Sequence, residues 1–98
     1  MLDHRTETFM AVCNVMNYRE AAELLHITQP AVTQHIQFLE KEYGCRLFIY
    51  ENRKLIKTPA AQMLEDYLRS VQQRENFLRE KIKQWSPGTA YRCNQDHW

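Results

Sequence analysis

The sequence predicts a mainly α-helical fold: a winged helix-turn-helix of three helices and a β-hairpin wing, followed by a long dimerisation helix. Three observations support this fold. Cap residues precede apolar stripes of helical spacing, β-branched and aromatic residues take over near position 46, and a heptad-like stripe reaches position 85. We place the winged domain at 1–58, with the helix-turn-helix at about 18–37, the dimerisation helix at 59–85 and an irregular tail at 86–98.

The composition is that of an ordinary globular protein. The 98 residues are 44% hydrophobic and 26% charged, too hydrophobic for intrinsic disorder. No apolar run approaches the roughly 20 residues of a membrane span, and the polar N-terminus is unlike a signal peptide, so we expect a cytoplasmic protein with no membrane partner. The three cysteines are scattered, which argues against disulfides and a metal site. We expect Cys13 and Cys45, which stand in apolar patterns, to be buried thiols.

The first two helices are predicted from their caps. Asp3 can cap a helix whose inner face follows the three-or-four spacing, with Leu2, Thr6, Phe9, Cys13 and Met16. Asn17 and Glu20 form a capping box that begins a short second helix. In that helix Ala21 and Ala22 are small enough to let another helix approach closely.

A third helix completes the helix-turn-helix. His26 and Ile27 make a tight turn, Thr28 caps the helix, and proline follows in the first turn, where it costs little. The predicted buried stripe is Val32, Ile36, Leu39 and Tyr43, and Gly44 ends the helix. Helix, short turn and helix is the arrangement in which the second helix enters the DNA major groove.

The outward face of this third helix carries almost no charge. We expect it to contact DNA through Thr28, Gln29, Pro30, Thr33, Gln34 and Gln37. Glutamine pairs bidentately with adenine, and threonine bonds a base or offers its methyl to thymine. A polar face that is merely solvated is the alternative. The net charge of only +1 weighs against a nucleic-acid partner, since a strongly basic footprint is absent.

The segment 46–58 predicts a β-hairpin wing with a charged tip. Arg53 and Lys54 stand at this tip, where they could contact phosphates or enter the minor groove. Arg19, near the start of the second helix, is another candidate phosphate contact. The plainer alternative for all three is a solvated surface charge. No paired carboxylates, Ser-His-Asp pattern or glycine-rich loop is present, so we expect neither catalysis nor a cofactor.

The predicted dimerisation helix begins after Thr58, with proline in its first turn. Its apolar stripe, interrupted by Glu75, includes Leu64, Leu68, Val71, Leu78, Ile82 and Trp85. A stripe this long needs a second surface, most simply a second copy of itself. The alternative is a helix that folds back onto its own domain.

The segment NYREAAELLHITQPAVTQHIQFLEKEYGCRLF, residues 17–48, resembles the winged helix-turn-helix of LysR-type transcriptional regulators. The resemblance implies that two linker helices pair antiparallel and that the dimer binds an interrupted palindrome in double-stranded DNA. It places Gln29, Pro30, Thr33 and Gln34 on bases or backbone, with Arg53 as the wing contact. Three departures stand out: Tyr50 replaces an arginine, Ala61 replaces a glycine, and Thr33-Gln34 replaces a Ser-Arg pair.

Two functions follow from these expectations. The first is sequence-specific DNA binding as a dimer, in transcriptional regulation. The second is a protein-interaction module that forms mixed dimers with a full-length relative. The resemblance covers an N-terminal domain and linker helix without an effector domain, so we expect no small-molecule effector for this chain.

Overall fold

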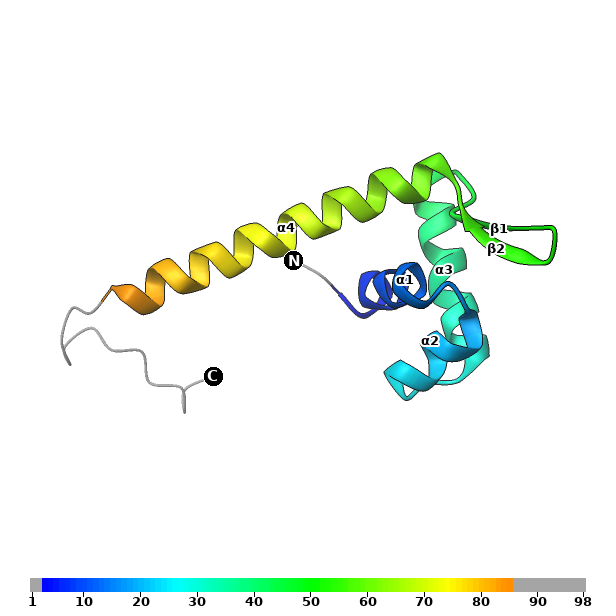
Figure 1. Ribbon diagram of the computed structural model, residues 1–98, viewed down its shortest axis with the longest axis horizontal. Helices are drawn as coiled ribbons and strands as arrows, with labels where there is room; N and C mark the ends of the chain where they lie inside the picture. Colours follow the sequence, from blue (N-terminus) through cyan, green and yellow to red (C-terminus); the bar gives the residue numbers. More distant parts are fainter. Residues whose placement is uncertain (1–2, 86–98) are drawn as a thin grey trace.

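The computed structural model describes residues 3–85, which form helices and one hairpin in the predicted order. The elements are α1 (His4–Val15), α2 (Tyr18–Leu25), α3 (Gln29–Tyr43), β1 (Phe48–Glu51), β2 (Lys54–Lys57) and α4 (Pro59–Gln84). The hairpin projects from one side of the three-helix domain, and α4 extends away on the other side (Figure 1). The prediction of a mainly α winged helix-turn-helix with a long final helix is confirmed. The predicted tail at 86–98, and Leu2, lie outside the described residues.

Each helix begins at the cap that the sequence predicts. The cap side chains are those of Asp3, Asn17, Thr28 and Thr58. Their oxygens accept backbone N–H groups of the first turn at 2.8 to 3.2 Å. Pro30 and Pro59 occupy the first turns of α3 and α4, where an N–H would have no helical partner. Local chemistry therefore sets where the helices start.

The turn of the helix-turn-helix is built on His26. This residue ends α2 in the left-handed conformation, with φ 58°, and the N–H of Ile27 donates to the carbonyl of Ala22 at 3.0 Å. Glycine is common at such positions because it has no Cβ to clash. Histidine is among the residues that tolerate the left-handed region, so the turn forms without glycine.

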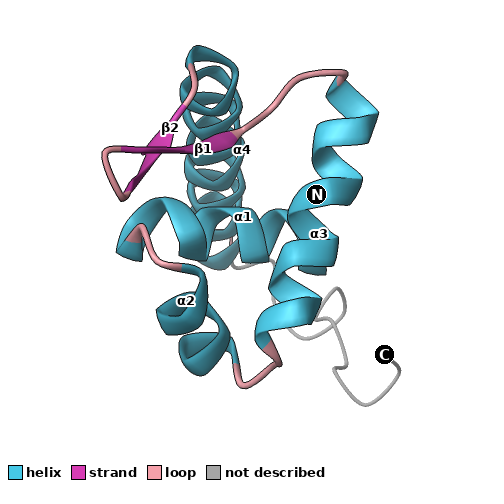
Figure 2. Cartoon of the chain, turned by 90° about the vertical axis from the view of Figure 1, so that its right-hand side faces the viewer, coloured by secondary structure: helices cyan, strands magenta, loops and turns pink. Residues whose placement is uncertain are grey.

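The core lies where α1 crosses the other helices. In Figure 2, α1 lies between α2 and α3, and α4 is seen nearly along its axis. The buried apolar residues include Phe9, Val12, Val32, Ile36, Leu47, Phe48, Ala61, Leu64 and Leu68. The rings of Phe9 and Phe48, whose centroids lie 5.5 Å apart, join α1 to the hairpin. The first turns of α4 are therefore part of the domain core.

The structure corrects four of the sequence expectations about burial. Leu64 and Leu68 are 8% and 5% exposed within their own chain, so they stabilise the domain and do not belong to the exposed stripe. Tyr43, expected inside, is 56% exposed at the last turn of α3, and Cys45 is exposed just beyond it. Cys13 is buried as expected, and burial raises the pKa of its thiol to about 12, which keeps it protonated.

The hairpin has a two-residue turn. Phe48 pairs with Lys57 and Glu51 with Lys54, which leaves Asn52 and Arg53 between the strands. Both turn residues have positive φ, 52° and 64°. A two-residue turn with positive φ at both positions is type I′, the turn whose twist matches antiparallel strands.

Among the helices that the structure describes, none is long and apolar enough to cross a membrane.

Candidate nucleic-acid interface

The outward face of α3 presents amides to solvent. Gln29, Gln34 and Gln37 are exposed, as is Pro30, while Thr33 is half-buried. None of the three glutamine side chains hydrogen-bonds another residue within 3–85. Val32, Ile36 and Leu39 pack in the core on the opposite face of α3. The glutamine amides therefore point away from the domain, where they can hydrogen-bond an external partner.

Thr28 already has a structural task. Its Oγ1 accepts the N–H of Ala31 at 3.2 Å as the α3 cap. A hydroxyl has one hydrogen and two lone pairs, so this bond leaves the O–H available as a donor. Thr28 can therefore cap the helix and contact a phosphate at the same time.

The wing tip carries two cations that form no ion pair with the residues that the structure describes. Arg53 and Lys54 are exposed, and neither pairs with a carboxylate among the described residues. Arg53 occupies the second turn position, where type I′ turns prefer glycine. A side chain in the left-handed region costs roughly 1 kcal/mol. Strain of this kind concentrates at functional sites, which favours a role for the Arg53 guanidinium beyond the fold.

The third predicted cation has a partner. Arg19 Nη1 lies 3.3 Å from Glu23 Oε2, and both side chains are about two-thirds exposed. Arg46, Lys57, Arg69 and Arg79 also pair with carboxylates. These five cations are held by carboxylates of the chain, while the two of the wing tip stay available.

His35 attaches α3 to α1, a contact that the sequence did not reveal. Its Nδ1 shares a 2.8 Å hydrogen bond with Thr8 Oγ1, and its ring meets that of His4 edge-on at 5.0 Å between centroids. Burial lowers the pKa of His35, and the nearby positive charges of His4 and Arg5 lower it further. A neutral His35 thus holds the middle of α3 against α1 behind the exposed face.

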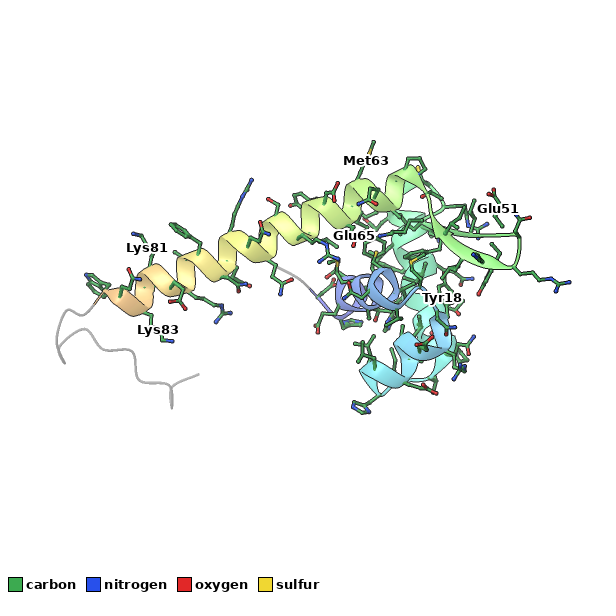
Figure 3. The ribbon with its side chains drawn as sticks, in the orientation of Figure 1. Tyr18, Glu51, Met63, Glu65, Lys81 and Lys83 are labelled. Atoms are coloured by element: carbon green, nitrogen blue, oxygen red, sulfur yellow. The ribbon has the colours of Figure 1, made fainter. Side chains whose placement is uncertain are left out.

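A buried carboxylate fixes the direction of α4. Glu65 is 4% exposed and accepts hydrogen bonds from Lys57 Nζ at 2.7 Å and Arg69 Nη2 at 2.6 Å. Arg69 in turn donates to Asn14 Oδ1 at 3.2 Å, which adds α1 to the network. Burial opposes ionisation, but the two hydrogen bonds outweigh it and hold the pKa of Glu65 below its ordinary value. Figure 3 shows Glu65 on the side of α4 that faces the domain.

The helical periodicity of the sequence does not reveal the role of Glu65. Its position between Leu64 and Leu68 was a weak signal that a carboxylate shares the inner face of the helix. Asn14 and Glu65 are far apart in the sequence, so no local sequence pattern indicates that they belong to one hydrogen-bond network. This network joins β2, α4 and α1, so it sets how the wing stands relative to the long helix.

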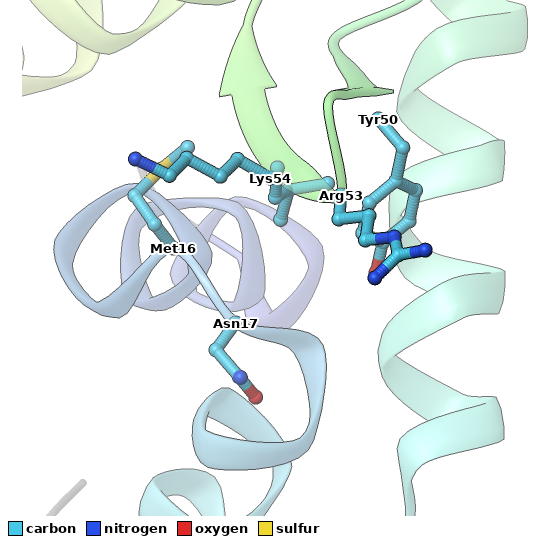
Figure 4. A pocket seen from close by; sticks show the side chains of 6 residues that line it. Met16, Asn17, Tyr50, Arg53 and Lys54 are labelled. Atoms are coloured by element: carbon cyan, nitrogen blue, oxygen red, sulfur yellow. The ribbon is translucent and has the colours of Figure 1, made fainter.

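A cleft of about 320 Å³ separates the wing from the corner between α1 and α2. It is lined by Met16, Asn17, Tyr50, Arg53, Lys54 and Leu55. In Figure 4, Lys54 reaches over Met16 on one side, while Tyr50 and Arg53 lie on the side of α3. Asn17 Oδ1 accepts the N–H of Glu20, so its amide N–H groups remain available. The lining contains two cations and no carboxylate.

The second half of α4 is not covered by any other residue of the described part, 3–85. Val71 is half-buried, and every residue from 72 to 85 is exposed. The exposed large apolar side chains there are Phe77, Leu78, Ile82 and Trp85, each 55–65% exposed. This stripe is far from the wing, at the opposite end of the molecule (Figure 1).

Known proteins resemble this chain in both sequence and fold. Residues 4–62 match the family described as bacterial regulatory helix-turn-helix protein, lysR family. The uncharacterized HTH-type transcriptional regulator YxjO of Bacillus subtilis (strain 168) is 35% identical over 82 residues, which are 84% of this chain and 28% of that protein. The chain therefore spans less than a third of the length of this curated relative.

Two solved structures define the class more closely. A transcriptional regulator of the LysR family from Eggerthella lenta DSM 2243 is 59% identical, with a TM-score of 0.67 over 69% of this chain and 97% of that one. The BenM DNA-binding domain, in a complex with catB site 1 DNA, is 26% identical, with a TM-score of 0.75 over 91% of this chain and 100% of that one. The fold is that of a LysR-type DNA-binding domain with its linker helix. The chain belongs to the lysR family of bacterial regulatory helix-turn-helix proteins.

Proposed function

We propose that this chain binds double-stranded DNA sequence-specifically as a homodimer, and so regulates transcription without any enzymatic step. The observation that carries the proposal is the exposed α3 face, with amides that have no hydrogen-bond partner among residues 3–85. A regulator of bacterial DNA acts in the cytoplasm, which is the location we propose.

The proposal divides the contacts by chemistry. Gln29, Thr33 and Gln34 would read base edges from the first turns of α3, since the N-terminal part of the second helix meets the bases in this motif. Thr28 and Pro30 would lie against the backbone, and Gln37 at the groove margin. Arg53 and Lys54 would bind phosphates or the minor groove. Arg19 would act as a phosphate contact only by exchanging its bond to Glu23.

The exposed far half of α4 supports the homodimer. At 1.5 Å per residue, its 26 residues make a helix of about 39 Å, about half of which extends beyond the domain. Exposed Leu78 and Ile82 continue the line of Val71, and an apolar stripe of this length in water favours association. Two such helices in antiparallel contact would set two α3 helices at a fixed spacing. A dimer of that symmetry selects an interrupted palindrome.

Selection from a randomised duplex pool at near-physiological salt tests the proposal. The wild type should enrich a two-fold-related site, and the Thr33→Ala/Gln34→Ala double variant should lose that enrichment while its thermal unfolding stays unchanged. A wild type that binds but enriches no sequence would contradict base reading by α3.

The same α4 stripe supports a second function, a partner that forms mixed dimers with a full-length relative and removes it from DNA. Nothing in an apolar stripe restricts it to identical copies. The two functions can be distinguished by adding this chain to a complex of full-length YxjO and its selected duplex. Release of the duplex together with formation of heterodimers favours the second function, and unchanged binding favours the homodimer.

A further inference from the structure

The cleft between the wing and the α1–α2 corner has a lining that suits an anion. Arg53 and Lys54 approach it from the wing tip, and Asn17 lines it from the α2 cap. No carboxylate lines it to repel an anion. Arg53 and Tyr50 lie on the side of the cleft that faces α3 (Figure 4).

Tyr50 is the residue in this cleft without a structural explanation. It is 70% exposed, and its hydroxyl has no hydrogen-bond partner among residues 3–85. Its ring pairs across the hairpin with Leu55, a contact that phenylalanine would make equally well. The hydroxyl is therefore the part of Tyr50 that the fold does not use.

We propose that Tyr50 is a DNA-contacting residue, whose phenol O–H donates a hydrogen bond to a backbone phosphate held on the α3 side of this cleft together with Arg53. The inference rests on the proposed function, DNA binding through α3 and the wing. A phenol is a neutral donor, so it holds a phosphate oxygen without displacing a counterion. Tyr50 then contributes affinity that does not depend on salt, beside two cations whose contribution does.

The DNA backbone is the source of phosphate that the geometry favours. Tyr50 and Arg53 lie on the side of the cleft toward α3, so a duplex lying on the α3 face would bring its backbone past both side chains. Free inorganic phosphate shares the chemistry but gains nothing from α3. Competition by inorganic phosphate against chloride at equal ionic strength distinguishes the two.

Fluorescence anisotropy with the duplex selected by the wild type tests the inference. Tyr50→Phe keeps the ring and removes only the hydroxyl. It should raise Kd about tenfold per bound protomer, since a hydrogen bond to a charged group is lost. The slope of log Kd against log salt should stay unchanged. Lys54→Gln should lower that slope by about 0.9 per bound protomer, the contribution of one neutralised phosphate. Tyr67→Phe, a change at an exposed tyrosine of α4, is the matched control and should bind within about twofold of the wild type.

A duplex series with one methylphosphonate at each position identifies the phosphate. One replacement per half-site should weaken the wild type, and should weaken Tyr50→Phe less, because the variant keeps only the contact of that phosphate with Arg53. A Tyr50→Phe variant that binds like the wild type would overturn the inference while leaving DNA binding intact. So would phosphate-specific competition that Tyr50→Phe abolishes, since it would point to a free-phosphate site. Absence of duplex binding by the wild type would overturn both the inference and the proposed function.

Discussion

Helices α3 and α4 begin alike but expose different faces. Each starts with a threonine whose Oγ1 accepts an N–H at 3.2 Å, followed by proline in the first turn. Each buries one stripe against α1. What stays outside differs: α3 exposes uncharged glutamines, and the far half of α4 exposes Phe77, Leu78 and Ile82. Amides match base edges and apolar side chains match another apolar surface, so the exposed face indicates the partner of each helix.

The two halves of α4 also differ in exposure. Leu68 and Leu78 stand on the same heptad-like stripe, yet Leu68 is 5% exposed and Leu78 is 55% exposed. The difference arises because the domain ends near Val71. One stripe therefore serves the fold in its first half and is available for association in its second half.

The largest effect should come from truncating the buried half of the stripe. Leu68→Ala leaves a cavity in the core and should lower the free energy of unfolding by about 3 kcal/mol at every protein concentration. Leu78→Ala, its matched control, should lower stability only at concentrations where the chain is dimeric. Urea unfolding across a dilution series measures both. A concentration-independent loss for Leu78→Ala would contradict the division of α4.

The exposed half is tested by Leu78→Asp. A charge at the centre of an apolar interface should convert the dimer to a monomer, which light scattering measures directly. Folding of the domain should be unaffected, since Leu78 makes no contribution to the core. A dimer that survives both Leu78→Asp and Ile82→Asp would remove α4 from the interface.

Glu65 holds the first half of α4 against the winged domain. Glu65→Gln should cost about 2 kcal/mol, less than a fully buried pair because Lys57 and Arg69 are partly exposed. The lowered pKa means that this contribution is complete above the ordinary value of 4.5 and is lost as pH falls through the folded value. The difference between wild type and variant should therefore shrink below pH 4.5. A difference that is constant with pH would contradict the role of the carboxylate.

A smaller effect of opposite sign should come from the wing. Arg53→Gly relieves a side chain at φ 64° and should stabilise the fold by about 1 kcal/mol. The same change should weaken DNA binding and lower the salt slope by about 0.9 per bound protomer. Thermal unfolding measures the gain in stability, and fluorescence anisotropy measures the loss of DNA affinity. Stabilisation without any loss of binding would show that the strain at Arg53 serves no contact.

The sequence predicts what is local and misses what is tertiary. All four caps are confirmed, since each depends on a side chain and the first turn that follows it. The exposure of Tyr43 depends on where the hairpin and α4 lie, which no periodicity reports. The type I′ turn at Asn52 and Arg53 was missed because the usual Asn-Gly pair is absent.

The same limit applies to the candidate site. The exposed amides of α3 follow from its apolar stripe, and so does their placement on one face. The roles of Glu65 and His35 do not follow, because each bonds a residue on another element. The cleft that contains Tyr50 also forms only when the wing meets the α1–α2 corner.

The central claim is that α3 reads bases while the wing binds backbone. The most direct test is the ratio of Kd values for the selected duplex and for one with shuffled half-sites, measured for Gln29→Ala and Arg53→Gln. Gln29→Ala should reduce this discrimination about tenfold per half-site, the value of one bidentate contact. Arg53→Gln should weaken both duplexes alike and leave the ratio within about twofold. Discrimination that survives Gln29→Ala but falls with Arg53→Gln would contradict the account.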